Sequence, residues 1–164
     1  MGKKNSHCSY CGQPFADDVP WPRRCACGRT TWINPIPVAV VLLPVDDGLL
    51  LIRRAIEPQR GKLALPGGYV NFGESWQAGA ARELVEETGI VIDPARVELA
   101  GAHSTPDGAM VLMFARAPRT TAAALPAFVA TDETAERVIA SAPLELAFSL
   151  HTEMARRFFA AVKS

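Results

Sequence analysis

The chain has 164 residues, and its basic and acidic side chains balance to give no formal net charge at neutral pH. A length of this order predicts one domain with room for a small appendage. The balance excludes a general electrostatic attraction to nucleic acid or to an anionic membrane, so local groups or metal ions must hold any polyanionic ligand. No apolar run approaches the ~20 residues of a membrane span, and the first residues lack the apolar core of an export signal. We therefore expect a cytoplasmic protein without a membrane partner.

The segment 1–33 holds all four cysteines, as Cys8-x2-Cys11 and Cys25-x-Cys27. Four thiolates in two pairs are typical of a closed, structural Zn²⁺ site. We predict a zinc-ribbon-like segment that depends on its metal, because so short a segment has too little apolar surface to fold alone. The second pair has one intervening residue where a ribbon usually has two, so disulfides or free thiols remain the alternative.

The Asn-Pro and Ile-Pro steps at 34–37 resist helix and mark the start of a second domain, which we place at 34–164. Its pattern is α/β, with apolar strand runs between turn residues. Strands are predicted at 38–43, 49–54, 90–92, 97–104, 109–117 and 133–140. One helix is predicted from the N-cap Ser75 to Thr88, before Gly89, and another at 150–162 with Leu150, Met154, Phe158 and Val162 on its core face. Strands around two helices favour a mixed sheet between helices.

The first predicted helix carries Glu83, Glu86 and Glu87 in its last turns, with Arg82 as the only basic residue among them. At 3.6 residues per turn the last two glutamates lie on either side of the first, beside the apolar face. A solvated acidic face is the ordinary interpretation. However, the helix dipole disfavours anions there, and like charges ~4 Å apart repel by about 4 kcal/mol at an effective dielectric near 20. A divalent cation such as Mg²⁺ or Mn²⁺ reverses that repulsion and admits a phosphate ligand.

The stretch from Gly68 through Glu74 to the run Arg82–Ile90 resembles the Nudix box of the Nudix hydrolases, with every fixed position filled. The flanking stretches NPIPVAVVLL, LLLIRRAIEPQRGKLALPGG, DET and ELAFSLHTEMARRFF are similar to Nudix proteins with an N-terminal zinc ribbon, a subgroup that includes ADP-ribose and FAD pyrophosphatases. The resemblance implies an α/β/α sandwich with a mixed sheet, preceded by a small zinc ribbon.

The resemblance also implies roles for single residues. Glu83, Glu86 and Glu87 would hold Mg²⁺ or Mn²⁺, with the main-chain carbonyl of Gly67 as a further ligand. Arg82 would pair with Glu74 and orient the carboxylates. The implied reaction is metal-assisted hydrolysis of a nucleoside diphosphate linked to another moiety, such as ADP-ribose, NADH or FAD, to a nucleotide monophosphate and phospho-X.

The general base and the substrate contacts are less defined. Glu133 and Glu136 lie where the family can place a catalytic acid on a later loop, and we favour Glu136, although a solvated surface acid is the alternative for both. Several side chains have the chemistry to contact a base or a phosphate, and the sequence singles out none of them: Tyr69, Phe72, Trp76, Arg53, Arg54, Arg60 and His103.

The alternative function is binding without catalysis, as a nucleotide sensor or as a zinc-ribbon module for nucleic acid. The first segment does contain five basic residues, Lys3, Lys4, Arg23, Arg24 and Arg29. We nevertheless expect a small nucleotide derivative rather than nucleic acid as the partner, because an intact box is not needed by a sensor. The resemblance also suggests a homodimer.

Overall fold

The computed structural model describes residues 5–16 and 18–162, and the chain divides into two compact units, Met1–Pro35 and Ile36–Ser164. Within the described residues, no helix is long and apolar enough to cross a membrane.

The first unit contains a two-stranded antiparallel sheet of β1 (Arg23–Arg24) and β2 (Thr30–Thr31). Of its described residues, the buried hydrophobic side chains are those of Cys8 and Cys25. The predicted basic residues Lys3 and Lys4 lie outside the described residues. With strands this short, the unit has only a small core: besides the two cysteines, the rings of Phe15 and Trp21 lie 6.1 Å apart with the Arg23 guanidinium over both.

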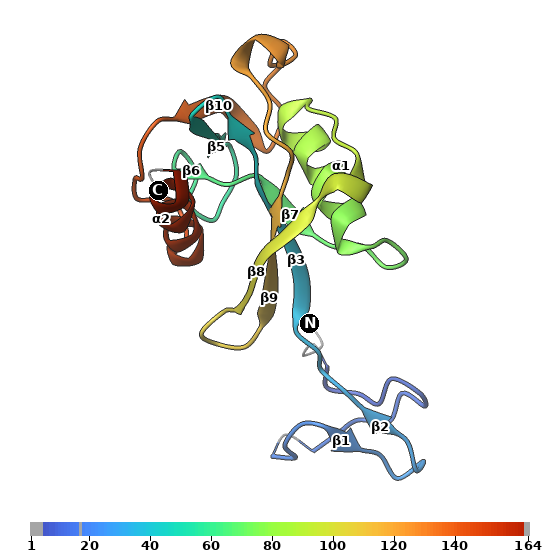
Figure 1. Cartoon of the computed structure of the whole chain (residues 1–164). Coiled ribbons are helices and arrows are strands. Elements are labelled where there is room, and N and C mark those ends of the chain that lie inside the picture. Colours follow the sequence, from blue (N-terminus) through green and yellow to red (C-terminus); the bar gives the residue numbers. More distant parts are fainter. Residues whose placement is uncertain (1–4, 17, 163–164) are drawn as a thin grey trace. The chain divides into compact units, whose positions relative to one another are not determined.

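The second unit contains two four-stranded sheets (Figure 1). The first sheet is mixed, because β3 and β9 are parallel while the other pairs are antiparallel; its order is β7 (Gly67–Tyr69), β3 (Ile36–Leu42), β9 (Met110–Arg116) and β8 (Glu98–Ser104). The second sheet is antiparallel, in the order β10 (Thr134–Ala140), β5 (Gly48–Arg54) and β4 (Pro44–Val45), with β6 (Leu63–Ala64) also paired to β5. Two short 3-10 helices follow α1 and β9, at Pro94–Arg96 and Ala122–Ala124.

The two helices α1 (Trp76–Thr88) and α2 (Ser149–Val162) lie on opposite sides of these sheets (Figure 1). Strand β3 is buried on both faces, since Val40 packs with residues of α2 while Val41 packs with Leu84 of α1. Burial on both faces explains why this strand has a continuous apolar run instead of alternation. The predicted fold class, a mixed α/β/α sandwich, is confirmed.

The two predicted helices are present with nearly the expected ends. The side chain of Ser75 caps α1 by accepting a hydrogen bond from the Ala78 N–H at 3.2 Å, and Gly89 ends it in the left-handed conformation. In α2, Met154 and Phe158 are buried in the core as predicted, while the side chain of Val162 lies outside the described residues.

The strand predicted at 90–92 is wrong. Ile90 and Ile92 instead pack into the core cluster of α1, and the Ile90 N–H donates to Thr88 Oγ1 at 3.3 Å rather than to a neighbouring strand. Asp93 then caps the short helix that starts at Pro94. The apolar run therefore reflects packing over the end of α1, which local pattern alone does not distinguish from strand pairing.

Candidate active site

Strand β7 brings two glycines against β3 and α1 without room for a side chain at either one. Gly67 has φ 151°, and a Cβ there would lie 2.3 Å from the Ala39 carbonyl oxygen. A Cβ at Gly68 would lie 2.5 Å from the carboxylate of Glu83. Because these two residues are glycines, a carboxylate from the helix can lie directly against the backbone of β7.

Helix α1 turns two of its three clustered glutamates inward. Glu83 and Glu87 are buried, with Glu87 only 4% exposed, whereas Glu86 is exposed. The Gly67 N–H donates to Glu87 Oε2 at 2.8 Å. Glutamate is rarely buried unless it is paired, so two buried carboxylates in one cluster need a physical reason.

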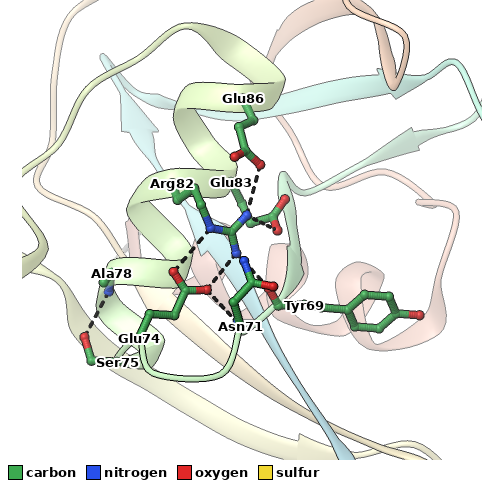
Figure 2. A network of polar contacts seen from close by, with 8 residues as sticks. All are labelled: Tyr69, Asn71, Glu74, Ser75, Ala78, Arg82, Glu83 and Glu86. Atoms are coloured by element: carbon green, nitrogen blue, oxygen red, sulfur yellow. Dashed lines mark hydrogen bonds and ion pairs between the residues drawn. The ribbon is translucent and has the colours of Figure 1, made fainter.

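Arg82 lies at the centre of a polar network that joins α1 to the loop before it (Figure 2). Its guanidinium binds Glu74 through two hydrogen bonds, at 2.8 and 3.2 Å, so the predicted Glu74–Arg82 pair is present. Its Nη1 donates to Glu83 Oε1 at 2.8 Å and to Glu86 Oε2 at 2.9 Å, and its Nη2 donates to the Tyr69 carbonyl oxygen. One cation thus fixes the positions of three carboxylates and ties the loop before α1 to the helix.

Glu87 is the carboxylate that this network leaves without a cation. Among the described residues it has no salt-bridge partner. The pKa of Glu87 is raised to about 8, chiefly by burial; the hydrogen bond from Gly67 and the positive charge of Arg54 lower it, and the negative charges of Glu83 and Glu133 raise it. Burial also raises the pKa of Glu83, against the opposing effect of Arg82. The cluster therefore holds more negative charge than its own cations balance.

A cavity of about 760 Å³ opens at this cluster. Glu83, Glu86, Glu87 and Glu133 line it, together with both glycines of the turn. Much of its remaining wall is apolar, including Val40, Leu65, Met110, Leu112, Phe148 and Leu150. A cavity with carboxylates at one part and apolar side chains at another suits a ligand with one charged and one apolar portion.

The two acids considered as general base lie in different surroundings. Glu133 lines the cavity and is close enough to Glu83 and Glu87 to raise the pKa of both. Glu136 is absent from the cavity wall and forms an ion pair with Arg53, at 2.7 Å between Oε2 and Nε. The β-bulge between Thr134 and Glu136 shifts the register here, which the sequence does not reveal.

The side chains that had the chemistry to contact a base or a phosphate lie in different places. Tyr69 and Arg54 line the cavity, the latter with its guanidinium 5.2 Å from the ring centre of Phe148. Phe72 points fully into solvent, at 108% exposure. Trp76, the first residue of α1, packs against the core, and His103 packs edge-on against Phe114. Arg53 is paired with Glu136, and Arg60 is exposed.

Two cavity residues, Phe148 and His151, were not singled out by the sequence. They lie at the start of α2, 60 and 63 positions after Thr88, the last residue of the acidic helix. Both lie in the stretch ELAFSLHTEMARRFF, but its similarity to Nudix proteins does not indicate a role for either side chain; the hydrogen bonds of Leu63 and Leu65 with the start of α2 bring them to the cavity.

The four cysteines of the first unit also gather. All four are free thiols whose Sγ atoms lie within 4.8 Å of one another, with Cys8 and Cys27 3.9 Å apart and Cys11 and Cys25 3.6 Å apart. A hydrogen bond from the backbone of Tyr10 leads the causes that lower the pKa of Cys8 to about 6. Four sulfurs bound tetrahedrally at ~2.3 Å lie about 3.8 Å apart, so the cluster has the donors and the size for Zn²⁺. The single residue between Cys25 and Cys27 does not prevent this arrangement.

A family model described as the NUDIX domain matches residues 34–160. An ADP-ribose pyrophosphatase from Methanocaldococcus jannaschii is 37% identical over 76 residues, which cover 46% of this chain and 44% of that protein. An NAD-capped RNA hydrolase, NudC from Edwardsiella ictaluri, is 35% identical over 83 residues, or 49% of this chain and 32% of that protein. The chain therefore spans less than half the length of these curated relatives.

The fold is similar to that of solved structures over a longer range. The crystal structure of a NUDIX hydrolase from Nitrosomonas europaea superposes with a TM-score of 0.76 at 27% identity, covering 94% of this chain and 90% of that one. A MutT/nudix family protein from Enterococcus faecalis superposes with a TM-score of 0.58 at 30% identity, covering 66% of this chain and 44% of that one.

Proposed function

The chain belongs to the NUDIX family, and we propose that it is an enzyme that hydrolyses the diphosphate bond of a nucleoside diphosphate linked to a second group. The products would be a nucleoside monophosphate and the phosphorylated second group. The observation that carries this proposal is the buried Glu87, which has no cation partner among the described residues and lines the cavity beside Glu83 and Glu133. The names of the two curated relatives support the same reaction class.

The carboxylate cluster fits a divalent cation. Its donors are hard oxygen atoms, which Mg²⁺ and Mn²⁺ prefer. Gly68 leaves room that a Cβ would fill at the Glu83 carboxylate, and Glu87 carries an uncompensated negative charge when ionised. We propose that Glu83, Glu86 and Glu87 hold the cation, with the carbonyl of Gly67 as a further ligand. When bound, the cation supplies positive charge for the diphosphate and acidifies the attacking water.

The residues of the chain divide the remaining work. Arg82 orients Glu83 and Glu86 through its hydrogen bonds and keeps the loop with Glu74 against the helix. Glu133, which faces the cavity, is better placed than Glu136 to take the proton from the attacking water. The apolar wall excludes water around the rest of the substrate and thereby strengthens the electrostatic interactions at the diphosphate.

The substrate class follows from the two parts of the cavity. A volume of about 760 Å³ with an apolar wall suits a compound that carries a base or a second sugar beyond its diphosphate. We propose adenine-containing compounds such as ADP-ribose, NADH or FAD, in line with the ADP-ribose pyrophosphatase among the relatives.

We further propose that residues 1–33 form a zinc-ribbon domain before a hydrolase domain of residues 34–164. The compact cluster of four free thiols supports Zn²⁺ as its structural ion, held by Cys8, Cys11, Cys25 and Cys27. A closed site with four protein ligands leaves no open position for a substrate, so its role would be structural rather than catalytic.

The experiment that tests the proposed function is an assay of ADP-ribose, NADH, FAD, diadenosine polyphosphates and nucleoside triphosphates with Mg²⁺ or Mn²⁺. We expect nucleoside monophosphate from the diphosphate-linked compounds, and a loss of at least about 100-fold in kcat when Glu86 and Glu87 are both replaced by Gln. The exposed Glu98→Gln on β8 is the matched control and should retain activity. Undiminished turnover in the double variant would end the proposal, and tight binding without turnover in the wild type would favour a nucleotide sensor.

A further inference from the structure

His151 is buried in the wall of the cavity, away from the carboxylate cluster in the sequence. It belongs to the first turn of α2 and is 7% exposed. The rings of Phe148 and Phe114 meet it edge-on, with ring centres 5.1 and 6.0 Å from its own. Its contacts with these two rings hold the orientation of the imidazole, so its polar atoms point in fixed directions.

One of these polar atoms is used by the backbone. The Leu65 N–H donates to His151 Nδ1 at 3.2 Å. A nitrogen that accepts a hydrogen bond carries no proton in the neutral ring, so the proton is on Nε2. Burial, together with the positive charge of Arg54, lowers the pKa of His151 to about 4, which keeps the ring neutral near neutral pH. His151 is therefore a neutral donor with a single N–H to offer.

The donor atom Nε2 belongs to a residue that lines the cavity. Within the described residues, Nε2 has no hydrogen-bond partner, yet it is not among the fully buried polar atoms that lack one. Because His151 is one of the residues that line the cavity, we assign its remaining N–H donor to that space. A donor left without a partner in an apolar wall is costly unless a ligand or water satisfies it.

The surroundings select the kind of acceptor. Leu65 and Phe148 contact His151. The nearby cation, Arg54 over the Phe148 ring, is the group that can pair with a phosphate, which leaves the neutral His151 donor for an uncharged acceptor. An uncharged acceptor on an aromatic base or a sugar suits this environment. We infer that His151 is a specificity-determining residue, whose Nε2–H donates to a ring nitrogen or hydroxyl of the substrate's base or sugar.

The same chain segment positions this donor and the acidic cluster. The amide of Leu65 holds the His151 ring, and the amide of Gly67, two residues later, holds the Glu87 carboxylate. The Ala147 N–H donates to the Leu63 carbonyl oxygen at 2.7 Å and fastens the start of α2 to the same segment. The group that would bind the base or sugar is thus held at a fixed distance from the carboxylates that would act on the diphosphate bond. This inference rests on the proposed function, since it names the substrate group that the same cavity reads.

The test separates the two nitrogens of the ring. His151→Asn keeps an acceptor near Nδ1 for the Leu65 N–H but removes the distal donor, whereas His151→Gln offers an amide N–H near the position of Nε2. His103→Asn is the matched control, because His103 also packs edge-on against Phe114 but is absent from the cavity wall. Thermal unfolding of each variant verifies that it is folded.

Each variant is assayed with ADP-ribose and with analogues that replace one ring nitrogen by CH (1-, 3- and 7-deazaadenine) or one ribose hydroxyl by hydrogen. In the wild type we expect one analogue to lose about tenfold in kcat/KM relative to ADP-ribose. His151→Asn should hydrolyse that analogue and ADP-ribose with equal kcat/KM, while His151→Gln and His103→Asn should retain the discrimination. A merely structural role would lower kcat/KM for all compounds alike and leave their ratios unchanged.

Two failures are distinguishable. If the wild type hydrolyses ADP-ribose but His151→Asn discriminates among the analogues as the wild type does, or the wild type discriminates among none of them, the role of His151 is overturned and the proposed function stands. If the wild type hydrolyses neither ADP-ribose nor any other diphosphate-linked compound, the proposed function falls and the inference falls with it.

Discussion

Among the described residues, the glutamates of α1 and the four cysteines of the first unit are built in opposite ways. The glutamates of α1 belong to a unit with two large core clusters, and Arg82, the Gly67 amide and the Gly68 backbone hold them in place. The four cysteines belong to a unit whose strands are two residues long and whose described buried hydrophobic side chains are Cys8 and Cys25 themselves.

The two clusters therefore differ in whether the fold around them would depend on a bound metal. Folding of the second unit buries the glutamate carboxylates, and burial of a carboxylate is unfavourable unless a cation balances its charge. A bound cation would remove this unfavourable free energy, but the fold would not depend on it. In the first unit, whose core is small, a bound metal would supply much of the free energy of folding, because binding free energy at such a site is folding free energy. One cluster is suited to catalysis and the other to structure.

The largest expected effect is therefore on the first unit. We expect a zinc-selective chelator to abolish its ordered structure, because structural Zn²⁺ sites contribute roughly 10–16 kcal/mol to folding. Amide resonances of residues 5–16 and 18–35 in a two-dimensional NMR spectrum should collapse to unfolded positions, while those of 36–162 should remain. Dispersed resonances of the first unit in a chain that contains no metal would break the comparison.

The next effect concerns the proton acceptor of the second unit. Replacement of Glu133 by Gln should lower kcat by about 10²–10⁴-fold, the usual contribution of a general base. Glu136→Gln should stay within about twofold, because the Glu136 carboxylate pairs with Arg53 outside the cavity. Steady-state kinetics at saturating substrate and Mg²⁺ decide between them, and the reverse order of effects would return the role to Glu136.

The smallest effect is on the stability of the protein without Mg²⁺. The pKa of Glu87 is raised from 4.5 to about 8 in the folded state. The folded state then binds more protons than the unfolded one, so the free energy of unfolding falls as pH rises from about 4.5 to about 8. Glu87→Gln should remove part of this fall and raise Tm at pH 8 by several degrees, at ~2–4 °C per kcal/mol.

Calorimetry from pH 5 to 9, in a zinc-containing buffer without Mg²⁺, measures this difference. Glu98→Gln, a substitution at an exposed glutamate on β8, should follow the wild type. If Tm changes with pH in the same way in the wild type and in Glu87→Gln, burial does not raise the pKa of Glu87. That result would remove one reason to expect a cation beside this carboxylate.

Much of the second unit is predictable from the sequence because its signals are local. Ser75 and Gly89 mark the ends of α1 through capping, and the apolar run at 38–43 indicates a strand buried on both faces. The run 90–92 has the same composition as a strand, but its side chains cover the end of α1 instead of pairing. Whether an apolar run pairs with a neighbouring strand or packs over a helix depends on residues far away in the sequence.

The candidate site shows the same division. Glu83, Glu86, Glu87 and Arg82 come from one helix, so their spacing predicts that they share a side of it. The position of Glu133 depends on a β-bulge in β10, and that of His151 on the packing of α2. Both lie in stretches similar to Nudix proteins, but nothing local indicates that these two side chains face the cavity. The sequence alone therefore favours Glu136 as the base and does not single out His151.

The most direct test of the account is a titration of the zinc-loaded protein with Mn²⁺, followed by electron paramagnetic resonance of the free ion. The wild type and Glu98→Gln should bind Mn²⁺ with equal affinity, and Glu87→Gln should bind it at least about tenfold more weakly. Equal Mn²⁺ affinity in the wild type and Glu87→Gln, or no binding in the wild type in the presence of AMP, would contradict the claim that the glutamates of α1 hold a divalent cation.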